Sequence, residues 1–304
     1  MPKHTSSRLA GAPISWGVCE VPGWGRQLPP ERVLAEMAGL GLTATELGPI
    51  GYLPLDGAAL RATLELHGLR LVGGFVPLVL HDSDRSGALA RAEAIAAALA
   101  AGGADVFVAA LVRDDAWSAP EPLDDAQWAR LVAGLDEVAE LVAARGLELA
   151  VHPHWGTLLE RADAIERLLG ASAAGWCLDT GHLLLAGIDP VAFAEAHGDR
   201  TVHVHLKDVD AAVAGRLRAG ELTLVEATQA GLFRPLGAGD ARIEPVLRAL
   251  ARHGYERWLV LEQDTAITGP EPPVGSGPVV DVRQSIDFLD TVALEEERGV
   301  ARHA

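Results

Sequence analysis

The sequence predicts a (β/α)8 barrel of the TIM type, and three observations lead to this prediction. Short β-prone runs alternate along the chain with helical stretches rich in Ala, Leu, Glu and Arg. About eight such units fit into 304 residues, a length that this fold often has. Alternation favours a parallel sheet with right-handed crossovers, and about eight units favour closure of that sheet into a barrel.

The expected elements follow one another in a regular order. The expected strands are residues 10–16, 44–47, 70–76, 106–110, 148–151, 175–178, 201–206 and 258–261. The expected helices are residues 30–40, 57–67, 87–101, 123–145, 157–169, 189–197, 243–253 and 282–294. Glycines that are typical of helix C-termini follow several of these helices, namely Gly41, Gly68, Gly146 and Gly254.

We expect one domain over residues 1–304, with an ordered core over about residues 10–295. The alternative architecture is an open doubly wound sheet. The Gly-x-Gly-x-x-Gly pattern of dinucleotide-binding folds does not follow the first strand, which weakens that alternative. The Gly/Pro-rich stretch 268–278 is expected to be a loop, because too little chain follows it to form a second domain.

Composition excludes several classes of partner. The formal net charge is −17, so the cationic surface needed to bind DNA, RNA or anionic membranes is not expected. Residues 1–9 lack the apolar stretch of a signal peptide, and apolar runs such as 94–101 are too short to span a membrane. Cys19 and Cys177 are too few for a disulfide framework and fit a reducing compartment. We therefore expect a cytoplasmic protein.

Polar side chains gather at the carboxyl ends of the predicted strands. The segments concerned are Glu46, His152-Pro153-His154, Asp179-Thr180-Gly181-His182, His203 to Asp208, and Glu262-Gln263-Asp264. In a barrel these ends open onto one face, which is where active sites of this fold lie. Residues that are far apart in the sequence are therefore expected to converge in space.

Each of these residues also has a structural interpretation. A single His at a strand end can be a hydrogen-bonded packing residue, and Asp179 can be a helix N-cap. Glu262 closes an apolar strand, however, and a buried carboxylate is costly unless it is paired or bound to a metal. Together, imidazoles and carboxylates at four consecutive strand ends predict a site for Mn²⁺, Co²⁺, Fe²⁺ or Zn²⁺.

The period of two along the seventh strand orders the side chains there. His203, His205 and Lys207 share one face, while Asp208 points the other way and can orient a neighbour. His205 lies nearer the strand end and is the better candidate ligand, so we expect His203 to be a deeper packing or supporting residue. Cys177 lies on the same face as Asp179 at another depth and is not counted as a ligand.

These segments, together with Ser15-Trp16-Gly17 and Glu46-Leu47-Gly48-Pro49, resemble the sugar phosphate isomerase/epimerase superfamily of xylose-isomerase-like barrels. Within it they are most similar to the inosose dehydratases. The resemblance covers residues from about 10 to about 295. It implies that Asp179, His205 and Glu262 are metal ligands, with Mn²⁺ or Co²⁺ as the most expected ion.

At the fifth strand the sequence departs from the wider pattern. Most members of the superfamily have Glu there, which epimerases use as an acid/base, and this chain has His152. The departure argues against epimerisation and fits the dehydratases. The resemblance favours His152 as the fourth ligand, with His154 left open. It also implies that His182 contacts the substrate.

The resemblance implies a hydro-lyase that removes water from a cyclic polyol ketone such as 2-keto-myo-inositol, in inositol catabolism. Lys207, with a depressed pKa, is the expected acid/base, and Glu46 and His154 are the other candidates. Trp16 and Tyr52, with Trp24 nearby, are expected to wall the substrate pocket, although ordinary packing explains aromatic residues equally well.

The rival functions are a sugar or sugar-phosphate isomerase or epimerase, and another polyol-directed lyase on the same barrel. A metal-dependent endonuclease disagrees with the net charge of −17. A binding protein without activity is possible on any fold, but four intact ligand positions disfavour it. The sequence leaves the oligomeric state open, a homo-oligomer included.

Overall fold

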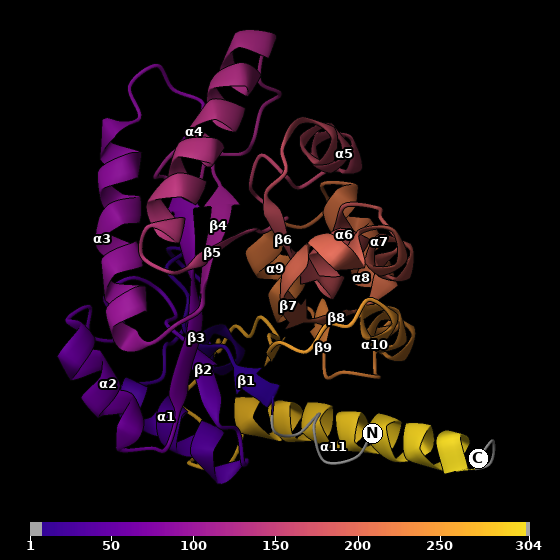
Figure 1. Cartoon of the computed structure of the whole chain (residues 1–304). Coiled ribbons are helices and arrows are strands. Elements are labelled where there is room, and N and C mark those ends of the chain that lie inside the picture. The colour runs from indigo at the N-terminus through magenta and orange to yellow at the C-terminus, as the bar shows by residue number, and fades with distance from the viewer. Residues whose placement is uncertain (1–7, 302–304) are drawn as a thin grey trace.

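The computed structural model, which describes residues 8–301, contains a closed barrel of eight parallel strands surrounded by helices (Figure 1). The predicted fold class is therefore confirmed. In their order around the barrel the strands are β1 (Leu9–Gly11), β10 (Leu259–Leu261), β7 (Thr201–Leu206), β6 (Gly175–Asp179), β5 (Glu148–Val151), β4 (Val106–Leu111), β3 (Arg70–Leu78) and β2 (Ala44–Glu46).

Helices follow the strands, as the alternation predicts. The main outer helices are α1 (Pro30–Gly39), α2 (Gly57–Glu65), α3 (Ser86–Gly102), α4 (Asp125–Ala143), α5 (Ala162–Ala171), α7 (Pro190–His197), α10 (Ile243–Arg252) and α11 (Pro278–Ala301). In Figure 1, α11 is the long yellow helix that runs beneath the barrel near β1. Within the described residues, every helix is too short or too polar to cross a membrane.

The last helix, α11, begins four residues before the expected 282 and continues past the expected 294. Two expected elements nearer the carboxyl face of the barrel also differ from the prediction. The run 10–16 is strand only to Gly11, and Pro13–Trp16 forms a 3-10 helix that ends at Gly17 with φ +83°. Proline has no N–H to donate to a strand ladder, so the strand stops where Pro13 begins. The helix expected over 157–169 begins only at Ala162, because the Thr157 hydroxyl donates to the His154 carbonyl and shapes a turn instead.

After β7 the chain makes an excursion that the sequence pattern did not indicate. It contains β8 (Asp208–Val209), α8 (Ala211–Arg218), α9 (Leu224–Gln229) and β9 (Phe233–Arg234). Its apolar residues form a small cluster of their own with Leu185 of α6 (Thr180–Leu185), a short helix that the sequence indicated only through Asp179 as a possible N-cap. The excursion lies over the carboxyl end of the barrel and contributes Leu224 to the pocket there.

Side-chain size differs between the two sides of the barrel wall. Small residues such as Ala10, Ala44 and Ala150 point into the barrel, whereas the largest buried cluster fills the space between strands and helices. A tightly filled interior near the amino ends leaves the carboxyl ends to carry polar groups. This arrangement fixes the position of the site.

Asp208 ties the excursion to the barrel. Its buried carboxylate accepts hydrogen bonds from the backbone N–H groups of Val209, Gly237, Gly239 and Ala241, at 2.8–3.0 Å. A Cβ on Gly239 would lie 2.5 Å from Asp208 Oδ1. Only glycine therefore allows the loop to come this close to the carboxylate. The expectation that Asp208 points away from the site and orients a neighbour agrees with this geometry.

We predict that Asp208→Ala destabilises the protein by about 3 kcal/mol, because it leaves several buried N–H donors without an acceptor. The matched control is Asp210→Ala, which removes the half-buried cap of α8 and should cost about 1 kcal/mol. Urea unfolding of both variants measures the difference. Equal losses would contradict the anchoring role of Asp208.

Candidate metal centre

Four side chains from the ends of four neighbouring strands meet at the carboxyl face of the barrel: His152, Asp179, His205 and Glu262. Each offers one ligand atom, all these atoms lie within 4.8 Å of one another, and all four residues are buried. Strand register brings them together, since Asp179 pairs with His205 and the Glu262 N–H donates to the Leu206 carbonyl. These are the four residues that the sequence analysis selected as ligands.

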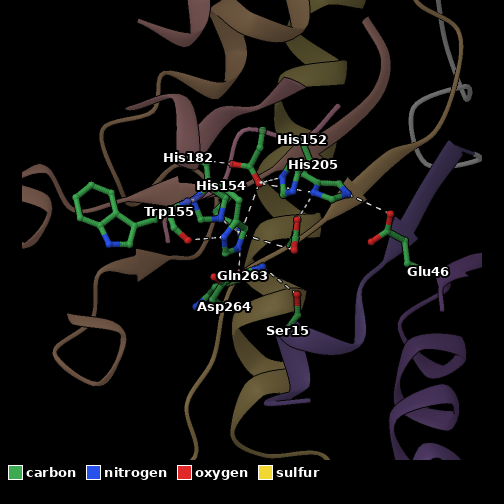
Figure 2. A network of polar contacts seen from close by, with 12 residues as sticks. Ser15, Glu46, His152, His154, Trp155, His182, His205, Gln263 and Asp264 are labelled. Atoms are coloured by element: carbon green, nitrogen blue, oxygen red, sulfur yellow. Dashed lines mark hydrogen bonds and ion pairs between the residues drawn. The ribbon is translucent and has the colours of Figure 1, made fainter. Parts of the chain in front are cut away.

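The geometry separates His152 from His154. His152 Nε2 lies 3.3 Å from Asp179 Oδ2, inside the four-residue cluster. His154 instead donates from Nδ1 to the Trp155 carbonyl at 2.6 Å, and lies beside His182 with ring centroids 3.9 Å apart (Figure 2). Of the two alternatives left open by the sequence, only His152 joins the cluster.

Asp179 is both a helix N-cap and a member of the candidate ligand cluster, the two interpretations that the sequence offered. Its Oδ1 accepts from the His182 N–H at 2.7 Å and caps α6, while Oδ2 faces His152 and lies 3.5 Å from Lys207 Nζ. A carboxylate held by one oxygen at a helix N-terminus has its other oxygen fixed in direction. The helix cap therefore positions the candidate ligand.

Glu46 and His203 support His205 from behind. Glu46 Oε1 lies 3.1 Å from His205 Nε2 (Figure 2). The same oxygen lies 2.8 Å from His203 Nε2. Burial raises the pKa of Glu46, but the two imidazoles outweigh it and hold that pKa well below its usual range. An ionised carboxylate only accepts, so each Nε2 carries the hydrogen.

The donor set fits a divalent cation. With Nε2 protonated, a neutral His205 has its lone pair on Nδ1, and Nδ1 contacts Glu262 Oε2 and lies 3.7 Å from Asp179 Oδ2. A lone pair that faces two carboxylates is repelled unless Nδ1 is protonated, as the raised pKa of His205 favours in the absence of metal, or a metal ion lies between them. Two imidazoles and two carboxylates suit Mn²⁺, Fe²⁺, Co²⁺ or Zn²⁺.

Cys177 lies deeper on β6 than Asp179. Its sulfur is within 4.8 Å of ligand nitrogens of His152 and His205. Burial raises the pKa of the Cys177 thiol to about 11, so the sulfur stays protonated at neutral pH.

Lys207 is fully buried beside the cluster, and its predicted depressed pKa is wrong. Burial lowers the pKa of Lys207, but the neighbouring carboxylates of Asp179, Asp264 and Glu262 outweigh burial and raise it above its ordinary value. The Nζ atom lies 2.7 Å from Asp264 Oδ1 and 3.0 Å from His182 Nε2. Lys207 is therefore an ammonium ion at neutral pH.

Asp264 is a site residue whose role the sequence analysis missed. It follows Glu262 by two residues, which puts it on the same face, and this spacing was the available signal. Burial raises its pKa to about 6, although Lys207 opposes the shift. Asp264 also lines the pocket beside the cluster, together with Glu262, Glu46 and His154.

The pocket has an aromatic wall, and of the expected residues only Trp24 belongs to it. Trp16 is buried and its indole N–H donates to Glu36 on α1, while the Tyr52 hydroxyl donates to the Leu28 carbonyl. The 3-10 helix turns the Trp16 side chain toward α1, so Trp16 packs behind the site. The aromatic residues that line the pocket are Trp24, Phe75 and Trp117.

Comparison with known proteins identifies the family. The sequence model described as "Xylose isomerase-like TIM barrel" matches residues 34–292. The chain belongs to this family. The match covers β2 to β10 and includes the four clustered residues.

Two curated relatives from this family cover most of the chain. The "Rhizopine catabolism protein MocC" of Rhizobium meliloti is 35% identical over 271 residues, which cover 85% of this chain and 82% of the relative. An "Inosose dehydratase" of Geobacillus kaustophilus is 33% identical over 278 residues, which cover 86% of this chain and 90% of the relative.

Solved structures of xylose isomerase-like barrels share the fold at low sequence identity. The IolI protein with a bound zinc atom has a TM-score of 0.68 and 13% identity, and covers 95% of this chain and 98% of its own. An L-ribulose 3-epimerase has a TM-score of 0.68 and 16% identity, and each chain covers 98% of the other. At this identity the comparison supports the fold alone.

The environment of His154 predicts a loss of stability in acid. Burial, with help from His152 and Lys207, lowers the pKa of His154 from 6.5 to about 3. The unfolded chain takes up this proton below about pH 6.5 and the folded chain does not, so stability falls as pH falls from 6.5 toward 3. We expect His154→Gln to make that fall shallower.

Urea midpoints at several values between about pH 7 and about pH 4.5, measured with EDTA present, test this expectation. EDTA removes the separate effect of protons that compete with a metal for its ligands. A variant with the same dependence on pH as wild-type would contradict the assignment of a neutral, half-buried imidazole to His154.

Proposed function

We propose that the protein is a divalent-metal-dependent dehydratase that removes water from a cyclic polyol ketone, with 2-keto-myo-inositol as the expected substrate. The observation that supports this most is the buried cluster of His152, Asp179, His205 and Glu262, of which Glu262 lines the pocket, with the Lys207 ammonium and the Asp264 carboxyl of raised pKa beside it. Several relatives at 27–33% identity carry the name inosose dehydratase, which supports the same reaction class.

In this proposal His152, Asp179, His205 and Glu262 hold Mn²⁺ or Co²⁺. When bound, such an ion polarises the ketone as a Lewis acid and favours charge on its oxygen. The zinc atom described for the IolI protein is consistent with a metal on this fold. Mixed nitrogen and oxygen ligands are compatible with several ions, and we favour Mn²⁺ or Co²⁺ from the resemblance.

Loss of water needs a base for the α-proton and an acid for the departing β-hydroxyl. We assign the base to Asp264, because a carboxylate with a pKa of about 6 is ionised at neutral pH yet basic enough to accept a proton. We assign the acid to Lys207, whose ammonium lies 2.7 Å from Asp264. The C–H proton passes to Asp264, the C–O bond breaks, and the hydroxyl leaves as water with a proton from Lys207.

The remaining polar residues have supporting roles in this scheme. Glu46 acts through His205 and His203 rather than on the substrate, since its Oε1 faces both imidazoles. His182 holds the Lys207 ammonium from 3.0 Å. His154 lines the pocket as a neutral imidazole and orients a substrate hydroxyl.

The rival function is a sugar isomerase or epimerase on the same barrel. Epimerisation by the wider superfamily uses a Glu at the fifth strand, and here His152 has that position. Buried His152 has its pKa lowered mainly by burial, so it is a neutral ligand rather than a carboxylate base. The substitution favours dehydration over epimerisation.

We expect the purified protein to contain about one divalent ion per chain and to form a dione from 2-keto-myo-inositol, with activity restored by Mn²⁺ or Co²⁺ after chelation. Elemental analysis and ultraviolet absorbance of the dione product measure the two properties. Glu262→Gln should lose both metal and activity. Bound metal with epimerised product and no dione would favour the rival function.

We expect Lys207→Met to lower kcat by roughly 10²–10⁴-fold, because general acid catalysis contributes about this much, and to retain the metal. Arg216→Met is the control, since Arg216 pairs with Glu221 on the surface and should change neither property. Steady-state kinetics and elemental analysis on the same samples are the measurements. Loss of the metal from Lys207→Met would assign Lys207 a structural role instead.

A further inference from the structure

A second group of ligand-type side chains surrounds Lys207. His154, His182 and Asp264 each offer one atom, and these atoms lie within 4.8 Å of one another. The Lys207 Nζ lies among them, 2.7 Å from Asp264 Oδ1 and 3.0 Å from His182 Nε2. Two imidazoles and a carboxylate of this kind form the usual surroundings of a divalent cation rather than of a lysine.

Two carboxylates connect this group to the first cluster. Glu262 turns Oε2 toward His205 and holds Oε1 3.7 Å from Lys207 Nζ. Asp179 Oδ2 lies 3.3 Å from His152 Nε2 and 3.5 Å from Lys207 Nζ. Carboxylates that face two cation positions at once are the arrangement found when two metal ions lie about 3.5–4 Å apart.

We infer that the Lys207 ammonium occupies the position of a second divalent cation, so that the centre is a one-metal site completed by a cation built into the chain. His154, His182 and Asp264, with Asp179 and Glu262 shared, then form a latent second metal site. The inference rests on the proposed first metal site and goes beyond it. It also gives a reason for so many acidic groups around one lysine.

The route of the lysine stem agrees with this assignment. A Cβ on Gly181 would lie 2.6 Å from Lys207 Cγ and 2.9 Å from Cδ, so the stem passes directly over this glycine. The stem is fully buried, and shortening it opens space for an ion and its water molecules. An ammonium also carries protons that it can donate at this position, which a bare metal ion cannot do.

The test is metal stoichiometry, which does not depend on turnover. Wild-type, Lys207→Ala and Lys207→Met are purified with excess Co²⁺, freed of loose metal by gel filtration, and analysed for cobalt per chain. We expect Lys207→Ala to bind one ion more than wild-type. Lys207→Met should match wild-type, because its stem still fills the space and brings no ligand charge.

A spectroscopic measurement and a double variant test whether the extra ion in Lys207→Ala lies in the proposed second site. Two Co²⁺ ions that share Glu262 should show magnetic coupling in the EPR spectrum of Lys207→Ala, and wild-type should not. Lys207→Ala combined with Asp264→Asn should return to the wild-type stoichiometry. Excess Co²⁺ should raise the Tm of Lys207→Ala more than that of wild-type, since the second ion binds only the folded variant.

Equal cobalt content in wild-type and Lys207→Ala would overturn the inference, and so would an extra ion that survives Asp264→Asn. Lys207→Ser is made in parallel, and failure of both variants to fold with Co²⁺ present would also contradict it, since a divalent ion must be able to replace the ammonium. The proposed function fails separately, if wild-type itself binds no metal and forms no dione.

Discussion

The balance of charge at the carboxyl end of the barrel is the constraint on which the rest of the structure depends. Glu46, Asp179, Glu262 and Asp264 are all buried there, and burial disfavours the ionised form of every one of them. Lys207 supplies only one positive charge. Buried carboxylates at such density require further cationic charge, from an imidazolium at His205 or from a metal ion between His205 and its neighbours.

The residues around the site hold the charged side chains in fixed orientations. Asp179 is held by the α6 N-terminus, His205 by Glu46, and Asp208 fixes the strand end next to Lys207. On the side of β1, Glu36 accepts from Trp16 Nε1 and from Arg32 Nε. Asp179 and His205 therefore each have one atom whose contact fixes the side chain and another atom that faces the cluster.

The sequence predicted the barrel and the convergence of polar strand ends for the same physical reason, whereas the choice of the four ligands came from the family resemblance. Parallel strands put their carboxyl ends on one face, so residues such as Asp179 and Glu262 converge whatever the loops do. The direction of a side chain just after a strand cannot be predicted from the alternation along the strand, because the chain bends there. His152 and His154 have the same parity along β5, and only the turn after the strand separates them.

The errors in the site have the same origin. Trp16 was expected in the pocket on the assumption of a continuous strand, and a 3-10 helix turned its indole to Glu36. The pKa of Lys207 was predicted from burial and a nearby cation. The pKa is instead raised by carboxylates from β6 and from the segment after β10. The distances from these carboxylates to the Lys207 ammonium cannot be read from the sequence. Short helices such as α8 and α9 lack a periodic pattern long enough to detect.

The replacement of a carboxylate by His152 at the fifth strand has a consequence for where the base lies. A neutral imidazole there leaves one negative charge fewer around the metal position, and it removes the group that would exchange a proton on that side. The acid and base must then come from one side of the pocket, where Asp264 and Lys207 lie 2.7 Å apart. A base and an acid that lie side by side, as Asp264 and Lys207 do, suit the removal of H and OH from neighbouring carbons. Inversion at a single carbon instead needs groups on opposite faces, so the asymmetry of charge around His152 itself favours elimination.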